Sequence, residues 1–115
     1  MSIIESYSFG RMAIDGTNYT KDVIIFPDGS ISSPWIRNRG HVLEVVDLEG
    51  LIAATPEIII CGTGVMGFLR PSSACIEHLR NRNIDFIAQK NSEATKTYNQ
   101  MSGKKKVGGC FHLTC

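Results

Sequence analysis

The feature that most constrains this chain is an apolar run that ends on a glycine-rich turn, residues 57–67, with the sequence Glu-Ile-Ile-Ile-Cys-Gly-Thr-Gly-Val-Met-Gly. Three consecutive isoleucines with no polar alternation indicate a strand that is buried on both faces. The glycines that follow allow positive φ and close approach of the backbone to a ligand or a neighbouring helix. The run therefore predicts where a site lies, although not which chemistry it performs.

The residues after this run alternate between helical and strand patterns. We expect a helix with Pro71 at its first position, a strand at 84–88, a helix capped by Asn91 or Ser92, and a last strand at 107–113. A strand, helix, strand, helix and strand in this order predict parallel strands joined by right-handed crossovers.

Short antiparallel strands are predicted in the first half of the chain. The Asp15-Gly16 pair is a strong hairpin signal, and a helix is expected at 47–54 with Asp47 as its N-cap. The strands are expected at 6–14, which we interpret as one irregular edge strand, and at 17–19, 23–26, 31–37 and 41–46.

These patterns predict one α/β domain over residues 1–115. It is a three-layer domain with a central mostly parallel sheet, helices, and an additional small antiparallel β layer from the N-terminal half. A length of 115 residues suits a single domain, and the hydrophobic content of 43% supplies one core. Because no apolar run approaches the ~20 residues of a membrane helix and the N-terminus lacks a signal pattern, we predict a cytoplasmic protein without a membrane partner.

The glycine turn matches the GxGxxG pattern of dinucleotide-binding proteins at residues 62–67, but its context differs. In that fold the third glycine lies within the helix that starts at the turn, whereas here Pro71 indicates a later helix start. The ribose-binding carboxylate is expected at the end of the next strand, where this chain has Gln89 and Lys90. We therefore expect no NAD, FAD or other cofactor.

Side chains that could carry catalysis or bind a metal are scattered along the chain. His41, His78 and His112 lack metal-ligand spacing, and the four cysteines form no CxxC pair. There is no GxSxG motif, Walker loop or pair of acids at a predicted strand end. We predict no metal site and no catalytic residue; the sequence leaves enzymatic activity open and favours its absence.

Ligand binding is predicted instead at the carboxyl end of the buried strand, the edge where ligands bind in open α/β sheets. A helix that starts at the same edge adds partial positive charge, which favours an anionic group. The candidate residues are Gly62, Thr63 and Gly64 in the turn, and Lys90, Asn91 and Tyr98 in or beside the helix. The alternative is that the turn packs strand against helix and that Tyr98 belongs to the core.

Several of these residues also follow a family pattern. They are the buried strand with Gly62-Thr63-Gly64, Pro71, Ala94, Thr97-Tyr98-Asn99, and the closing strand after Gly103, with Trp35 and Asp47-Leu48 in the first half. In these residues the chain resembles a small family of single-domain proteins of unknown biochemical activity. The family includes adipogenesis-associated domain proteins and mitochondrial assembly factors of respiratory complex I.

The resemblance implies a three-layer α/β fold with an additional β layer, no established enzyme activity and a role in protein assembly. The chain departs from the family pattern at residues 102–106, where Ser-Gly-Lys-Lys-Lys replaces Glu-Gly-Arg. This corner is therefore more basic than in relatives.

Two functional hypotheses follow. The leading one is a non-enzymatic interaction or assembly module with an unknown protein partner and a small cleft at the Gly62–Gly64 turn. The alternative is a small-molecule or anion-binding protein, including an undiscovered enzyme. Nucleic acid is the weakest candidate partner, because no aromatic side chains are interleaved with Lys104–Lys106 as stacking platforms.

Overall fold

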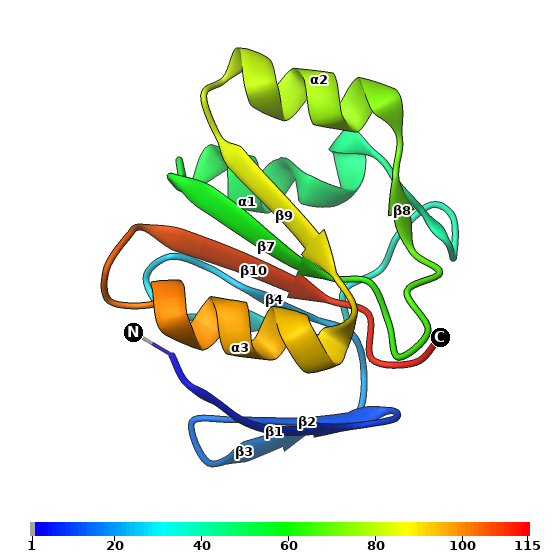
Figure 1. Cartoon of the computed structure of the whole chain (residues 1–115), viewed down its shortest axis with the longest axis vertical. Helices are drawn as coiled ribbons and strands as arrows, with labels where there is room; N and C mark the ends of the chain where they lie inside the picture. Colours follow the sequence, from blue (N-terminus) through cyan, green and yellow to red (C-terminus); the bar gives the residue numbers. More distant parts are fainter. Residues whose placement is uncertain (1) are drawn as a thin grey trace.

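The computed structural model describes residues 2–115, and its central element is a five-stranded mixed sheet (Figure 1). The strand order is β5-β4-β10-β7-β9. Three strands form its parallel part: β7 (Ile58–Gly62), β9 (Asp85–Gln89) and β10 (Val107–Phe111). Two antiparallel strands, β4 (Val23–Ile25) and β5 (Ile31–Ser32), extend it on the other side. The predicted α/β architecture with a central sheet is confirmed.

The helices lie on both faces of this sheet (Figure 1). Two of them, α1 (Glu49–Ala53) and α2 (Ser73–Asn81), cover one face, and α3 (Asn91–Met101) covers the other. The chain passes from β7 to β9 and then back beyond β7 to β10. Right-handed crossovers in opposite directions place their helices on opposite faces, which explains this division.

The isoleucine run supplies side chains to two separate cores. Ile58 and Ile60 belong to the core under α3, whereas Ile59 and Cys61 belong to the core under α1 and α2. Successive side chains of a strand point to opposite faces, and both faces of β7 are covered. This is the physical reason for a run without polar alternation.

The predicted additional layer is a small antiparallel sheet made of β1 (Ile4–Ser8), β2 (Arg11–Ile14) and β3 (Thr17–Tyr19). Both residues of the Asp15-Gly16 turn have positive φ, 49° and 84°, so the hairpin prediction is confirmed. The prediction of a single strand at 6–14 is wrong. Gly10, with a φ of 75°, lies in a turn that separates β1 from β2.

The predicted helix at 47–54 begins earlier and in another form. A 3-10 helix, η1 (Val45–Leu48), precedes α1, and its N-cap is Glu44 rather than Asp47. The Asp47 carboxylate accepts a hydrogen bond from the Glu44 amide at 2.9 Å. The same residue also ties Trp35 to this segment, because the indole nitrogen donates to the Asp47 carbonyl at 3.0 Å.

The helix start predicted at Pro71 is also shifted. Pro71 lies in the short strand β8 (Arg70–Pro71), which pairs in parallel with β6 (Val42–Leu43). Ser72 is the N-cap of α2, and its hydroxyl accepts from the Cys75 amide at 3.1 Å. The pairing with β6 holds Pro71 in an extended conformation, so the helix starts two residues later.

Among residues 2–115, no helix combines the length and the apolar content needed to cross a membrane.

Candidate functional site

The carboxyl edge of the parallel strands gathers residues from distant parts of the chain. β7 ends there at Gly62 and β10 ends there at Phe111, while the antiparallel strand β4 begins there at Val23. Figure 1 shows the C-terminal residues beside the loop that follows β7. The edge therefore combines the glycine turn, the start of α3, the start of β4 and residues 112–115.

The turn requires glycine at positions 62 and 64 because other parts of the chain pack closely against its backbone. A Cβ on Gly62 would collide with the Asn91 side-chain oxygen and the Phe111 ring. Gly64 has a φ of +105°, and a Cβ there would lie 2.7 Å from the Cys115 carbonyl carbon. The expected close approach is therefore present, and the neighbours are the start of α3, β10 and the end of the chain.

Asn91 is the residue that joins the turn to the last strand. Its side chain is fully buried, accepts from the Gly64 amide at 3.2 Å and donates to the His112 carbonyl at 2.6 Å. The prediction that Asn91 or Ser92 caps α3 is wrong. The N-cap is Lys90, without a side-chain cap bond, and Asn91 is the first residue of the helix. The side-chain carboxamide of Asn91 forms the bridge instead of a cap.

The amide groups of the turn are already hydrogen-bonded within the protein. The Thr63 amide donates to the Gln89 carbonyl at 2.9 Å, and the Val65 amide donates to the Thr114 carbonyl at 2.7 Å. The third turn amide, that of Gly64, is bonded to Asn91 as described. An anion at this turn would have to displace these partners.

Two further predicted site residues, Thr63 and Lys90, lie close to the glycine turn. Thr63 is buried, and its hydroxyl donates to the Gln89 carbonyl at 3.0 Å. Lys90 is exposed and its aliphatic stem borders Gly67. Both are thus close to the turn, as expected.

Tyr98, in contrast, is separated from the turn. It packs edge-on against Phe111, with ring centroids 6.1 Å apart, and is only 2% exposed. It lines a cavity near the amino ends of β7 and β10 together with Ser2, Glu57 and Ser102. Burial raises its pKa to about 12. Tyr98 therefore belongs to the core and lies toward the amino ends of the parallel strands, away from the carboxyl ends where the turn lies.

An ionic cluster behind the turn has no counterpart in the sequence-based predictions. We name it the Asp22 cluster, and it consists of Asp22, Arg37 and His112. Arg37 Nη1 and His112 Nδ1 each lie 2.8 Å from one Asp22 oxygen, and the Leu113 amide donates to the other at 2.7 Å. It joins the start of β4, the loop after β5 and the end of β10.

The Asp22 cluster is largely shielded from solvent. The side chains of Arg37 and Asp22 are 6% and 17% exposed, and the Arg37 guanidinium lies 4.6 Å from the centre of the Trp35 ring. Burial by itself would raise the pKa of Asp22, but hydrogen bonds from His112, the Leu113 amide and Arg37 lower it below its ordinary value. The carboxylate therefore stays charged at neutral pH and stabilises the contact between these segments.

The loop after the turn presents apolar side chains to solvent. Val65, Met66 and Phe68 are 40%, 58% and 50% exposed, and we call residues 65–68 the apolar loop. The Phe68 ring packs edge-on against His41, with centroids 5.9 Å apart. The side chains of Met66 and Phe68 therefore do not fill the carboxyl edge of the sheet.

Residues with metal-binding or nucleophilic chemistry form no separate site in the described chain. Across residues 2–115, no group of three or more His, Cys, Asp or Glu side chains is arranged to hold a metal ion. Cys61, Cys75 and Cys110 are free and buried, and Cys115 is free and partly exposed. Burial raises the pKa of Cys75 to about 11, so this thiol is a poor nucleophile.

This α/β fold, a mixed sheet with helices on both faces and an additional antiparallel sheet, is shared by solved structures of other proteins. A conserved hypothetical protein from Pyrococcus horikoshii OT3 is 26% identical, with a TM-score of 0.85 over 97% of this chain and 98% of that chain. The protein MT938 is 28% identical, with a TM-score of 0.82 over 100% of both chains. A Mth938-like domain from Bordetella pertussis shares the fold, with 15% identity and a TM-score of 0.71 over 97% of this chain and 85% of that chain.

A family model described as a protein of unknown function (DUF498/DUF598) matches residues 4–112. The chain belongs to this family. The predicted resemblance to proteins of unknown activity is confirmed at this level, and the three-layer fold agrees with the solved structures.

Proposed function

We propose that this protein is a non-enzymatic interaction or assembly module, and that the apolar loop at the carboxyl edge contacts its protein partner. The observation that carries the proposal is the exposure of three large apolar side chains, Val65, Met66 and Phe68, within one short loop. Contiguous exposed apolar side chains are typical of protein interaction sites.

The backbone of the apolar loop is tied to neighbouring segments, and this supports the proposal. The Val65 and Phe68 amides donate to the Thr114 and Cys115 carbonyls at 2.7 and 3.3 Å. The loop then returns to the turn, where the Leu69 amide donates to the Thr63 carbonyl at 3.1 Å. A loop fixed in this way presents its side chains without a large entropic cost of ordering on binding.

The alternative, binding of a small anion at the turn, has less support. The amides of Thr63, Gly64 and Val65 already have internal acceptors, and Lys90 is the only one of the six predicted ligand-binding residues that bears a charge. Titration with inorganic phosphate, followed by amide chemical shifts of the turn, tests this alternative. Saturable shifts confined to Thr63–Val65 would favour it over the interaction role.

Photo-crosslinking tests the interaction role. A photoreactive phenylalanine analogue is placed at Phe68, or at Ile3 as a control, because Ile3 is 44% exposed and lies beside Asp15 of the β2–β3 turn, at the other end of β1. We expect a discrete crosslinked partner from position 68, absent at position 3, and its loss when Met66→Asp is added. Equal adducts from both positions, or adducts unaffected by Met66→Asp, would contradict the proposal.

An assembly role, as the resemblance to adipogenesis-associated domain proteins and complex I assembly factors implies, remains part of this proposal, as does a cytoplasmic location. Identification of the crosslinked partner tests the first, and cell fractionation of the full chain tests the second.

A further inference from the structure

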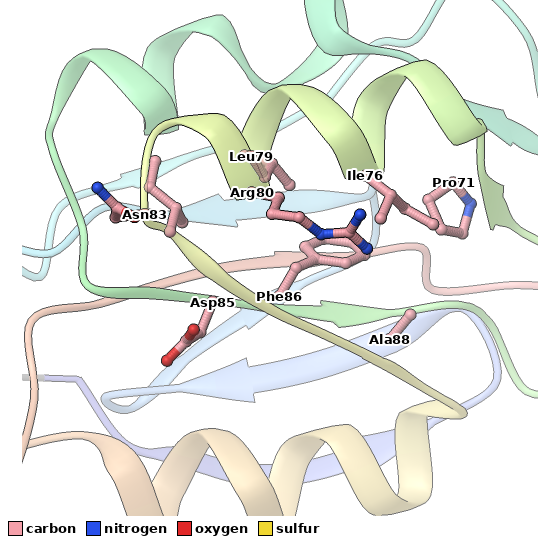
Figure 2. A pocket seen from close by; sticks show the side chains of 9 residues that line it. Pro71, Ile76, Leu79, Arg80, Asn83, Asp85, Phe86 and Ala88 are labelled. Atoms are coloured by element: carbon pink, nitrogen blue, oxygen red, sulfur yellow. The ribbon is translucent and has the colours of Figure 1, made fainter.

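The groove between α2 and β9 is a second surface, distinct from the apolar loop. It has a volume of about 520 Å³ and is lined by α2 on one side and by the outer strand of the sheet on the other. Figure 2 shows the Arg80 side chain over the Phe86 ring, and Ala88 further along β9 below Ile76 and Pro71. Phe86 and Ala88 both line the groove; Phe86 is half-buried, whereas the small side chain of Ala88 is exposed.

β9 is an edge strand without the usual protection. Edge strands are commonly shortened, interrupted by proline or charged, because their free backbone groups can pair with another strand. At the other edge, β5 has only two residues and Pro34 follows shortly. β9, in contrast, is a regular five-residue strand whose centre is Phe86-Ile87-Ala88.

The hydrogen bonds to β7 determine which residues of β9 face outward. The Asp85 amide donates to the Glu57 carbonyl at 3.0 Å, and the Gln89 carbonyl accepts from the Thr63 amide at 2.9 Å. Because backbone groups alternate in direction along a strand, Asp85, Ile87 and Gln89 bond to β7. The backbone N–H and C=O groups of Phe86 and Ala88 therefore point to the free edge.

We propose that β9 pairs antiparallel with β9 of a second copy of this chain, about a twofold axis at Ile87. Outward-facing residues must be opposite one another in a hydrogen-bonded antiparallel pair. Centring the pair on Ile87 places Phe86 opposite Ala88 of the second copy, and Ala88 opposite its Phe86. All outward N–H and C=O groups of these two residues are then paired, and the two sheets become one.

Side-chain shape favours a second copy as the occupant. In this register the Phe86 ring of one copy lies over Ala88 of the other, where the groove bordered by Pro71 and Ile76 is open. The twofold axis repeats the contact, so each copy supplies one large side chain and one space that receives it. Ile76, which is 38% exposed in the single chain, becomes covered.

The polar residues on the opposite face are also complementary. The register places Asp85 opposite Gln89 of the second copy. The Gln89 side-chain oxygen already accepts from the Thr97 hydroxyl at 2.7 Å, which leaves its NH₂ group to donate to the exposed Asp85 carboxylate.

Sedimentation velocity of the full chain over about a hundredfold range of concentration is the first measurement. We expect a monomer–dimer equilibrium. Ala88→Arg fills the space that receives Phe86 and should weaken the dimer by roughly tenfold or more. Ala74→Arg is the matched control, because Ala74 is exposed on α2 and does not line the groove; it should leave the equilibrium unchanged.

Disulfide trapping tests the register, in a Cys115→Ser background that removes the partly exposed native thiol. Ile87→Cys places two thiols on the axis, where the Cα atoms of a non-hydrogen-bonded pair lie about 4.5 Å apart, within the range of a disulfide. Gln89→Cys is the control on the same face. In the proposed register, residue 89 of one copy and residue 89 of the other are offset by four positions along the strands and lie about 14 Å apart.

We expect a covalent dimer from Ile87→Cys and none from Gln89→Cys. A monomer at every concentration, a dimer unaffected by Ala88→Arg, or equal trapping at positions 87 and 89 would each overturn the proposal. The sedimentation arm does not depend on the cysteine variants, so poor folding of Ile87→Cys leaves the test intact.

Discussion

Gly64→Ala is the substitution whose effect on stability is most closely determined by the structure. The new methyl group would lie 2.7 Å from both the carbonyl carbon and the oxygen of Cys115. In addition, a non-glycine residue at a φ of +105° is strained by about 1–3 kcal/mol. The variant must therefore accept backbone strain and displace the C-terminal segment.

Displacement of that segment weakens the two hydrogen bonds that it accepts from the Val65 and Phe68 amides. Each bond contributes about 1 kcal/mol to the free energy of unfolding. Together with the strain, we expect Gly64→Ala to lower this free energy by roughly 3–5 kcal/mol.

Gly16→Ala is the matched control. Gly16 also has positive φ, +84°, but nothing lies within 4 Å of an added Cβ, so we expect a loss of about 1 kcal/mol from strain alone. Gly108 is unsuitable as a neutral strand position, because a Cβ there would lie 2.9 Å from a Leu51 methyl group.

Urea denaturation at equilibrium measures both variants against the wild type, with the slope checked for constancy. The difference of about 2–4 kcal/mol between the two corresponds to a gap of roughly 10 °C in Tm for a chain of this size. Equal losses for Gly64→Ala and Gly16→Ala would refute the reasoning, because they would show that contact with Cys115 contributes nothing.

Three further predictions concern buried polar groups and thiols. Asn91→Ala leaves two buried backbone groups without their side-chain partner. We therefore expect the free energy of unfolding, measured by urea denaturation, to fall by about 2–4 kcal/mol, whereas Ser92→Ala, at an exposed position, should change it little. Similar losses for the two variants would count against the Asn91 bridge. The pKa of Asp22 is lowered from its ordinary value of 3.8, so its contribution to the free energy of unfolding is present above that pH and is lost as the pH falls through the lowered pKa. The difference in stability between the wild type and Asp22→Asn should therefore shrink in acid. A difference that grows would contradict this prediction. Finally, a thiol reagent should modify Cys115 quickly in the native protein and Cys75 only on unfolding, because Cys75 is buried and burial raises its pKa to about 11. Rapid modification of Cys75 in the native protein would be inconsistent with its burial.

The parts of the fold that have a local sequence signal could be predicted. The isoleucine run indicated a doubly covered strand, and the Asp15-Gly16 pair indicated a hairpin, because both depend on residues adjacent in sequence. Helix starts were less predictable. Asn91 looks like a cap by residue type, yet its side chain serves a contact with His112, 21 residues away.

The candidate site was predictable only in part, for the same reason. The glycine turn and Asn91 come together because both lie at the carboxyl edge of parallel strands, which the strand and helix order already implied. In the Asp22 cluster, Asp22 contacts Arg37, which is 15 positions away in the sequence, and His112, which is 90 positions away. Neither Asp22 nor Arg37 stands in a recognisable motif. Only the antiparallel placement of β4 beside β10 brings them to this edge, and the sequence contains no local signal for that pairing.

The position of β10 also determines when this protein can fold during its synthesis. β10 comes last among the strands in sequence, yet it lies between β4 and β7 at the middle of the sheet. Until residues 107–111 have left the ribosome, the two halves of the sheet have no common neighbour, and their apolar faces remain uncovered. Domains form their core as a unit, and contacts between distant residues form slowly because the loop must close first. The domain therefore completes its core only when β10 is available to take its place between β4 and β7.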